Sequence, residues 1–174
     1  MTAEQTGVRP VRSVLAFGSN LGARDDTIID AMAEIGRVAG IEVVARSSLY
    51  ETVAVKLHGL DELAPRYLNA VAIVSTELAP HDLLSVLNGI EHSHGRVRDE
   101  RWGDRTLDID VITYGSLEQS DETLTLPHPR AWQRDFVLAP WLEIEPDAVL
   151  PGHGPVAALL AATDDTARPT TRES

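Results

Sequence analysis

The chain has 174 residues, a formal net charge of −12 and no cysteine. Its length suits one domain with a proper core, its acidity excludes a general nucleic-acid binder, and the lack of cysteine excludes disulfides and thiolate metal sites. No apolar run is long enough to span a bilayer and the N-terminus lacks the apolar stretch of a signal peptide, so we expect a cytoplasmic protein.

The first strand is predicted at residues 11–17, after a polar stretch, residues 1–10, that has no periodicity and is expected to be a flexible tail. Residues 18–22, GSNLG, follow this strand directly. Such a glycine-bracketed turn either holds a phosphate or only joins strand to helix through the Ser19 and Asn20 side chains. The sequence leaves both readings open.

A helix and a second strand come next. Asp25 is a plausible N-cap, apolar residues then recur at helical spacing, and Gly40 closes the helix. Residues 41–52 read as a strand. Residues 53–66 have no clear period and form a loop long enough to act as a lid.

The third predicted strand, residues 67–76, is almost wholly apolar and is therefore expected to be central. Asn69 is the exception. Its amide offers a donor and an acceptor together, so it either satisfies a neighbouring backbone group or binds a ligand. Pro80 then opens a helix, since proline suits the first helical position.

An arginine-rich loop follows this helix, with Trp102 and Gly103 inside it. Guanidinium groups are planar forks that match phosphate oxygens, so the loop is a candidate phosphate-binding segment. The alternative is a solvated surface on which these arginines pair with neighbouring acids. The four arginines are Arg96, Arg98, Arg101 and Arg105.

Residues 107–112, LDIDVI, alternate apolar and acidic residues and read as a strand entering a core. Alternation places Asp108 and Asp110 on one face of that strand. Two adjacent carboxylates repel each other unless a cation lies between them, and oxygen ligands suit a hard ion, Mg²⁺ above all. No Walker-A string exists in the chain, so arginines and acid-bound metal would have to handle a nucleotide.

The C-terminal third predicts a hairpin over residues 115–126, a helix over 131–142 and a short last helix over 155–162. The whole order indicates an α+β fold with a ferredoxin-like split βαβ core, an antiparallel sheet with helices on one face, plus a C-terminal hairpin and helices. We expect one catalytic domain over residues 11–162 and a flexible tail over 163–174. This fold hosts many functions and decides none of them.

Several strings of this chain closely resemble the 6-hydroxymethyl-7,8-dihydropterin pyrophosphokinases of folate biosynthesis, and the resemblance runs from about Val14 to Leu150. It implies an enzyme that transfers pyrophosphate from ATP to 6-hydroxymethyl-7,8-dihydropterin and releases AMP. The strings are Gly95-Arg96-Val97-Arg98, Arg101-Trp102-Gly103, Arg105-Thr106-Leu107-Asp108-Ile109-Asp110 and Leu126-Pro127-His128-Pro129-Arg130.

The resemblance also implies roles for individual residues. Asp108 and Asp110 match the ligands of a pair of Mg²⁺ ions, and Arg96 and Arg105 match catalytic loop arginines that close on phosphates. The remaining positions match ATP contacts (Leu84, Asn88, Arg98, Val111, Thr125, His128, Arg134) and pterin contacts (Thr52, Val55, Tyr67, Asn69, Trp102, Phe136).

Some of these positions have a plain structural alternative. Leu84 and Val111 could equally be core residues, and His128 could be a loop histidine between two prolines. The chain also departs from the family's pattern, with Thr52-Val53-Ala54 where Thr-Pro-Pro is frequent and Thr123 where some members carry arginine.

Two other function classes compete with this reading. One is another metal-dependent Asp-x-Asp transferase, acting on nucleotides or sugar nucleotides. The other is a non-catalytic module for RNA or an amino acid, which the acidic charge and the absence of aromatics at residues 70–73 disfavour. We expect a monomer that binds ATP and a reduced pterin, and neither nucleic acid nor membranes.

Overall fold

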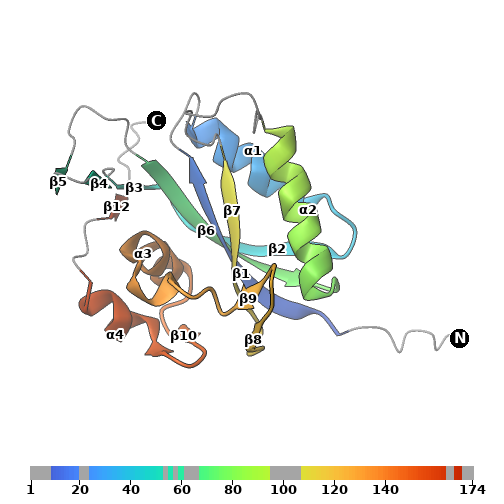
Figure 1. Ribbon diagram of the computed structural model, residues 1–174. Coiled ribbons are helices and arrows are strands. Elements are labelled where there is room, and N and C mark those ends of the chain that lie inside the picture. Colours follow the sequence, from blue (N-terminus) through green and yellow to red (C-terminus); the bar gives the residue numbers. More distant parts are fainter. Residues whose placement is uncertain are drawn as a thin grey trace, which may run out of the picture.

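The computed structural model describes residues 9–19, 24–52, 55–56, 59–60, 67–94, 107–163 and 167–169. A six-stranded sheet runs through its centre in the order β12-β3-β6-β1-β7, with β2 pairing along another part of β6, and all its pairs are antiparallel (Figure 1). The strands are β1 (Val11–Ser19), β2 (Ile41–Arg46), β3 (Tyr50–Thr52), β6 (Tyr67–Thr76), β7 (Asp108–Tyr114) and β12 (Arg168–Pro169).

Helices α1 (Arg24–Gly36) and α2 (Pro80–Ser93) cover one face of this sheet (Figure 1). Each helix turns a stripe of apolar residues at helical spacing toward the strands. Leu15 and Phe17 of β1 face the same core, as alternation along a strand requires. The helical stripes consist of Ile28, Ala31, Met32 and Ile35 in α1, and of Leu83, Leu87 and Ile90 in α2.

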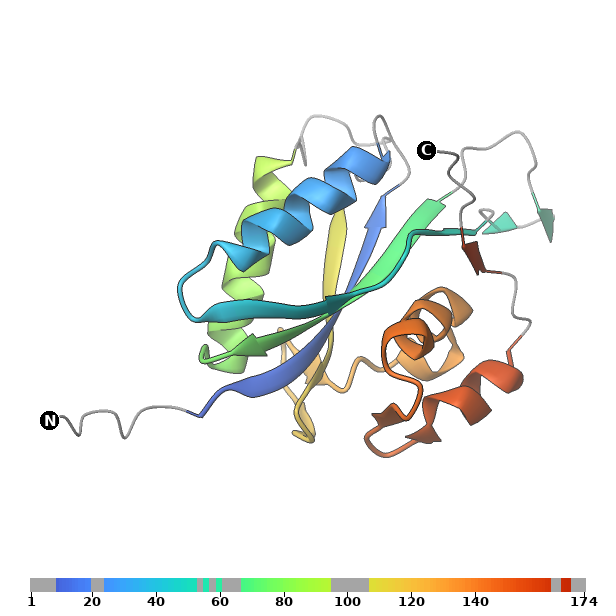
Figure 2. The ribbon, with the colours of Figure 1, turned by 180° about the vertical axis from the view of Figure 1, so that it is seen from behind.

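Helices α3 (Asp135–Ile144) and α4 (Val156–Ala161) lie on the other side of the sheet, as Figure 2 shows from behind. Val14 and Ala16, the alternate residues of β1, pack there with Trp141, which is 2% exposed. The expected ferredoxin-like core, with two helices on one face, is therefore confirmed. The C-terminal helices, expected as an addition to it, build a second core on the opposite face.

Among the described residues, three small hairpins lie outside the main sheet. They are β4 (Val55–Lys56) with β5 (Gly59–Leu60), β8 (Gln119–Ser120) with β9 (Thr125–Leu126), and β10 (Val149–Leu150) with β11 (Gly154–Pro155). The β8–β9 pair is the hairpin predicted at residues 115–126. At its tip Asp121 Oδ1 accepts the N–H groups of Thr123 and Leu124, both at 2.9 Å.

Two predicted elements are interrupted in the structure. The strand expected over residues 41–52 is divided into β2 and β3, because Ser47 leaves the β2 ladder and exchanges hydrogen bonds with Val71. The helix expected over residues 131–142 begins as a 3-10 turn, Ala131–Gln133, and is broken at Arg134, whose extended backbone (φ −105°, ψ 103°) precedes α3.

Part of the C-terminal segment joins the sheet. Arg168 and Pro169 of β12 pair with Glu51 and Tyr50 of β3, and Ala167, 3% exposed, donates its N–H to Asp135 Oδ2 at 3.0 Å. These residues lie within the tail that was expected to be flexible, and here they are paired. Within the described ranges, no helix is long and apolar enough to cross a membrane.

Candidate active site

Asp108 and Asp110 lie on the outermost strand, β7, facing the side of the sheet on which α3 packs. The register of β7 against β1 determines this orientation, because directly paired residues of antiparallel strands point to the same face. Asp110 is paired with Ala16 and Asp108 with Gly18. The alternate residue Ile109 is 3% exposed in the core under α1 and α2. The Asp110 side chain is 46% exposed, so a ligand can reach its carboxylate from solvent.

The same row of the sheet carries Asn69. Gly18 of β1 is paired with Asp108 on one side and with Asn69 of β6 on the other. At a strand spacing of about 4.8 Å, the two polar residues are about 10 Å apart across Gly18. A Cβ on Gly18 would lie 3.3 Å from Asn69 Oδ1, so glycine leaves the space beside the buried amide.

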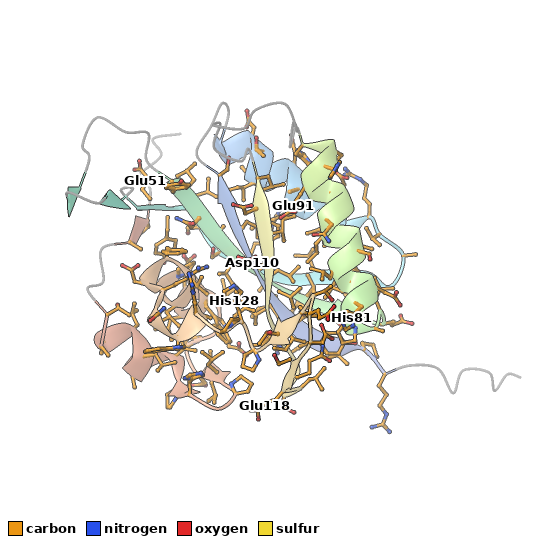
Figure 3. All side chains as sticks on the ribbon, viewed as in Figure 1. Glu51, His81, Glu91, Asp110, Glu118 and His128 are labelled. Atoms are coloured by element: carbon orange, nitrogen blue, oxygen red, sulfur yellow. The ribbon has the colours of Figure 1, made fainter. Side chains whose placement is uncertain are left out.

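His128 is placed against Asp110 by the chain segment before α3. Its backbone N–H donates to the Ile112 carbonyl of β7 at 2.9 Å, and its Nε2 lies 4.0 Å from Asp110 Oδ2. Figure 3 shows Asp110 and His128 as neighbours on one side of β7, with Glu91 on the side toward α2.

The protonation of His128 follows from its surroundings. Burial lowers the pKa of His128, Arg134 and Arg130 act in the same direction, and Asp110 opposes them. Its Nδ1 accepts the Arg130 N–H at 3.1 Å, which leaves the proton of the neutral ring on Nε2. A neutral imidazole therefore presents an N–H donor beside Asp110.

Arg134 and Phe136 meet at the start of α3. The Arg134 guanidinium carbon lies 5.6 Å from the centre of the Phe136 ring, which is a cation–π contact, and both side chains are half-buried. One residue predicted for ATP and one predicted for the pterin are thus adjacent, on the helix that covers the Asp110 face.

The other described positions predicted for ATP are more scattered. Leu84 packs against the core under α1 and α2, and Val111, 4% exposed, belongs to the same core, so the packing role is observed for both. Asn88 is exposed one turn beyond Leu84. Thr125 of β9 is half-buried, with its hydroxyl 3.3 Å from Ser120 Oγ.

The remaining predicted site residues are described only in part or not at all. Arg96, Arg98, Trp102 and Arg105 lie outside the described residues. Tyr67 is half-buried at the start of β6, paired with Thr52. For Thr52 and Val55 only the backbone is described, in β3 and β4.

One buried carboxylate, Glu91, was not among the predicted site residues. It is 5% exposed on α2, and its Oε2 accepts the Ile109 N–H at 2.7 Å, between the two aspartates. The signal in the sequence is a charged residue at the apolar spacing of that helix. It could not be separated there from an ordinary helix-surface residue.

The donor set fits Mg²⁺. Among the described residues, no group of three or more His, Cys, Asp or Glu side chains could hold a metal ion, so a site made entirely of protein ligands is not found there. Mg²⁺ does not require one, because it is usually bound by one or two carboxylates together with substrate phosphates and water. Two same-face carboxylates, of which Asp110 is open to solvent, match that habit.

Comparison with known proteins gives a family match over most of the chain. Residues 14–146 match the family model described as 7,8-dihydro-6-hydroxymethylpterin-pyrophosphokinase. A protein of Methylorubrum extorquens is 43% identical over 142 residues, covering 82% of this chain and 87% of the relative. One of Synechocystis is 40% identical over 156 residues, covering 89% and 77%. Both are named 2-amino-4-hydroxy-6-hydroxymethyldihydropteridine pyrophosphokinase.

Solved structures agree on the fold. A crystal structure of an HPPK-DHPS protein in complex with substrates matches 88% of this chain with a TM-score of 0.69 at 12% identity. Wild-type HPPK-DHPS of Plasmodium falciparum matches 88% with a TM-score of 0.65 at 13% identity. The chain spans 43% and 45% of those two proteins, less than half of each.

Proposed function

The chain belongs to the 7,8-dihydro-6-hydroxymethylpterin-pyrophosphokinase family, and from this premise we propose that Asp108 and Asp110 form the metal site at which it transfers pyrophosphate from ATP to the pterin in folate biosynthesis. The observation that carries the proposal is the pair of same-face carboxylates on β7, with the His128 Nε2 4.0 Å from Asp110. Each carboxylate is a hard oxygen donor, and we propose a pair of Mg²⁺ ions.

The reaction joins the pterin hydroxyl oxygen to the β-phosphorus of ATP and breaks the bond from that phosphorus to the oxygen bridging it to the α-phosphate. AMP leaves with that oxygen, and the hydroxyl proton is released. Charge neutralisation at the phosphates and a lowered pKa of the attacking hydroxyl are what bound Mg²⁺ supplies. The protein's share is positioning and electrostatics, as in other phosphoryl transfers.

His128 and Arg134 are proposed to bind phosphate oxygens. The neutral His128 ring keeps its proton on Nε2, the nitrogen that faces Asp110, and can donate it to an oxygen bound there. Arg134 keeps its charge and rests on Phe136, which limits its motion before a phosphate arrives. Arg96, Arg98 and Arg105 are proposed to complete the phosphate contacts, and Leu84, Asn88, Val111 and Thr125 to surround adenine and ribose.

The pterin is proposed to lie beside Asn69, on the α3 side of the sheet. A pterin is flat and rich in donors and acceptors, so its site needs aromatic faces and a side-chain amide. Phe136 and Tyr67 are the described rings, and Trp102 is proposed as a third. Thr52 and Val55 are proposed as backbone contacts.

We further propose a cytoplasmic monomer whose partners are ATP and the reduced pterin, with residues 11–162 as the catalytic domain. Both relatives are named as pyrophosphokinases, which agrees with these partners.

The test is product analysis with purified protein, ATP, 6-hydroxymethyl-7,8-dihydropterin and Mg²⁺. AMP and the pterin diphosphate should form in equal amounts, activity should stop on chelation, and it should return when Mg²⁺ is restored. ADP as the product would contradict pyrophosphoryl transfer, and activity without any divalent ion would contradict the metal site.

A further inference from the structure

Glu91 is a carboxylate in an apolar place. It lies near the end of α2, 5% exposed, next to Ile90 and Leu87, which are core residues. Burying a carboxylate is unfavourable unless hydrogen bonds replace the lost water. Its burial therefore requires hydrogen-bond partners.

One of these partners is the backbone of β7. Glu91 Oε2 accepts the Ile109 N–H at 2.7 Å, the short distance typical of a hydrogen bond to a charged acceptor. In the described part of the sheet, β7 pairs with β1 alone. Backbone groups of alternate residues point toward and away from the neighbouring strand, so Ile109, between Asp108 and Asp110, directs its N–H away from β1.

The peptide that carries this N–H joins Asp108 to Ile109. A peptide group is planar, so holding the Ile109 N–H also constrains the Asp108 Cα, which lies in the same plane and carries the Asp108 side chain. On the far side of Asp110, the Ile112 carbonyl accepts the His128 N–H at 2.9 Å. The outer edge of β7 is thus held on both sides of Asp110.

We propose that Glu91 is a positioning residue for the metal site: it holds the Ile109 N–H and thereby sets the separation of the two aspartate carboxylates. This inference rests on the proposed function, because it takes Asp108 and Asp110 to be the metal ligands. Removing a hydrogen-bond partner that orients a metal ligand typically lowers metal affinity about 10- to 100-fold.

Three substitutions separate the possible roles of Glu91. Glu91→Gln keeps a carbonyl acceptor at the same distance and removes the charge. Glu91→Asp keeps the charge and withdraws the acceptor by one methylene, and Glu91→Met keeps the bulk and removes the acceptor. Asp82→Asn is the matched control, since it removes an exposed acid from the same helix.

The readout is affinity for Mn²⁺, measured from the loss of its free-ion paramagnetic resonance signal, with α,β-methylene ATP at a concentration below that of the protein. Glu91→Met and Glu91→Asp should weaken binding about 10- to 100-fold. Glu91→Gln should stay within about fivefold of wild type, since a neutral acceptor replaces a charged one. Asp82→Asn should match wild type.

Two results would overturn the inference: wild-type affinity in Glu91→Met, or equal losses in Glu91→Gln and Glu91→Met, which would assign the effect to charge. Asp110→Ala, run in parallel, tests the premise separately, because wild-type affinity there would remove the metal site itself. If Glu91→Met and Glu91→Asp do not fold, hydrogen exchange in the wild-type chain decides. The Ile109 amide should exchange slowly, and rapid exchange would show that Glu91 does not hold it.

Discussion

The two edges of the sheet, at β7 and at β3, are held in different ways. At the β7 edge, the Glu91 carboxylate and the His128 N–H each hydrogen-bond to one backbone group of the strand. Asp110 between them remains 46% exposed. At the β3 edge, the strand β12 pairs with β3, and Tyr50 of β3 is 8% exposed. The strand proposed to carry the metal ligands is thus held along its outer edge, while Asp110 remains open to solvent.

The side of β3 is also tied to α3. Glu143 accepts the Tyr50 hydroxyl at 2.9 Å and the Ser48 hydroxyl at 2.8 Å, and Asp135 accepts the Ala167 N–H at 3.0 Å. These bonds stabilise packing rather than present groups to a ligand. Substitutions at β7 should therefore change catalysis, and those around β3 should change stability.

The largest effect is expected from Asp110→Ala. Loss of a metal ligand should cost several kcal/mol of transition-state stabilisation, hence about a thousandfold or more in rate. Folding should survive, because one of two repelling, partly exposed carboxylates is removed. AMP release and thermal melting should be measured together, with Asp147→Asn, an exposed acid far along the chain, as the control. Full activity in a stable Asp110→Ala protein would contradict the account.

Asn69→Ala should affect the pterin more than the metal. Losing the amide's bonds to the ring should cost about 1–3 kcal/mol, or about 10- to 100-fold in KM for the pterin. The KM for ATP and the Mn²⁺ affinity should change little, since Asp108 lies on the far side of Gly18. Steady-state kinetics with each substrate varied in turn separates the two, and an equal loss for both substrates would place Asn69 elsewhere.

Asp135→Ala should weaken the packing of β12 against β3 without changing metal affinity. It leaves the buried Ala167 N–H without its acceptor, at a cost of about 1–3 kcal/mol of stability. Chemical denaturation measures the loss, and hydrogen exchange should accelerate at residues 167–169. Unchanged exchange there would mean that this bond does not hold β12 against β3.

The smallest effect is expected at Tyr50, and it becomes visible in alkali, where the stabilising contribution of this residue is lost. Burial, followed by the hydrogen bond to Glu143 and its charge, raises the pKa of Tyr50 from 10.0 to about 12. The protonated form is thus favoured in the fold, so its stability contribution is intact below pH 10 and is lost as pH rises toward 12. Wild type should lose more stability over that window than Tyr50→Phe does, and parallel curves would refute this.

The sequence predicted the parts of this molecule that local pattern controls. Alternation in residues 107–112 correctly placed Leu107, Ile109 and Val111 in the core and the two aspartates together on the other face. The almost wholly apolar β6 was correctly predicted to be central. Both follow from side-chain periodicity, which needs no knowledge of distant segments.

The parts that it missed depend on contacts between distant segments. Ala167 meets Asp135 across 32 residues, and Glu91 meets Ile109 across 18. A glutamate on a helix and a short polar segment near a terminus have no local signature of such roles. Arg134 likewise breaks the expected helix because of its extended backbone, which no helix-breaking residue announces.

The most direct test of the central claim is to locate the metal on the sheet. Mn²⁺ broadens nuclear resonances steeply with proximity, so it can be added below stoichiometry to isotope-labelled protein saturated with α,β-methylene ATP. We expect the amide signals of Asp108, Asp110 and the paired Gly18 to disappear first, while those of α4 and β12 persist. Broadening centred on any other segment, or equal at the β7 and β3 edges of the sheet, would contradict a metal site on β7.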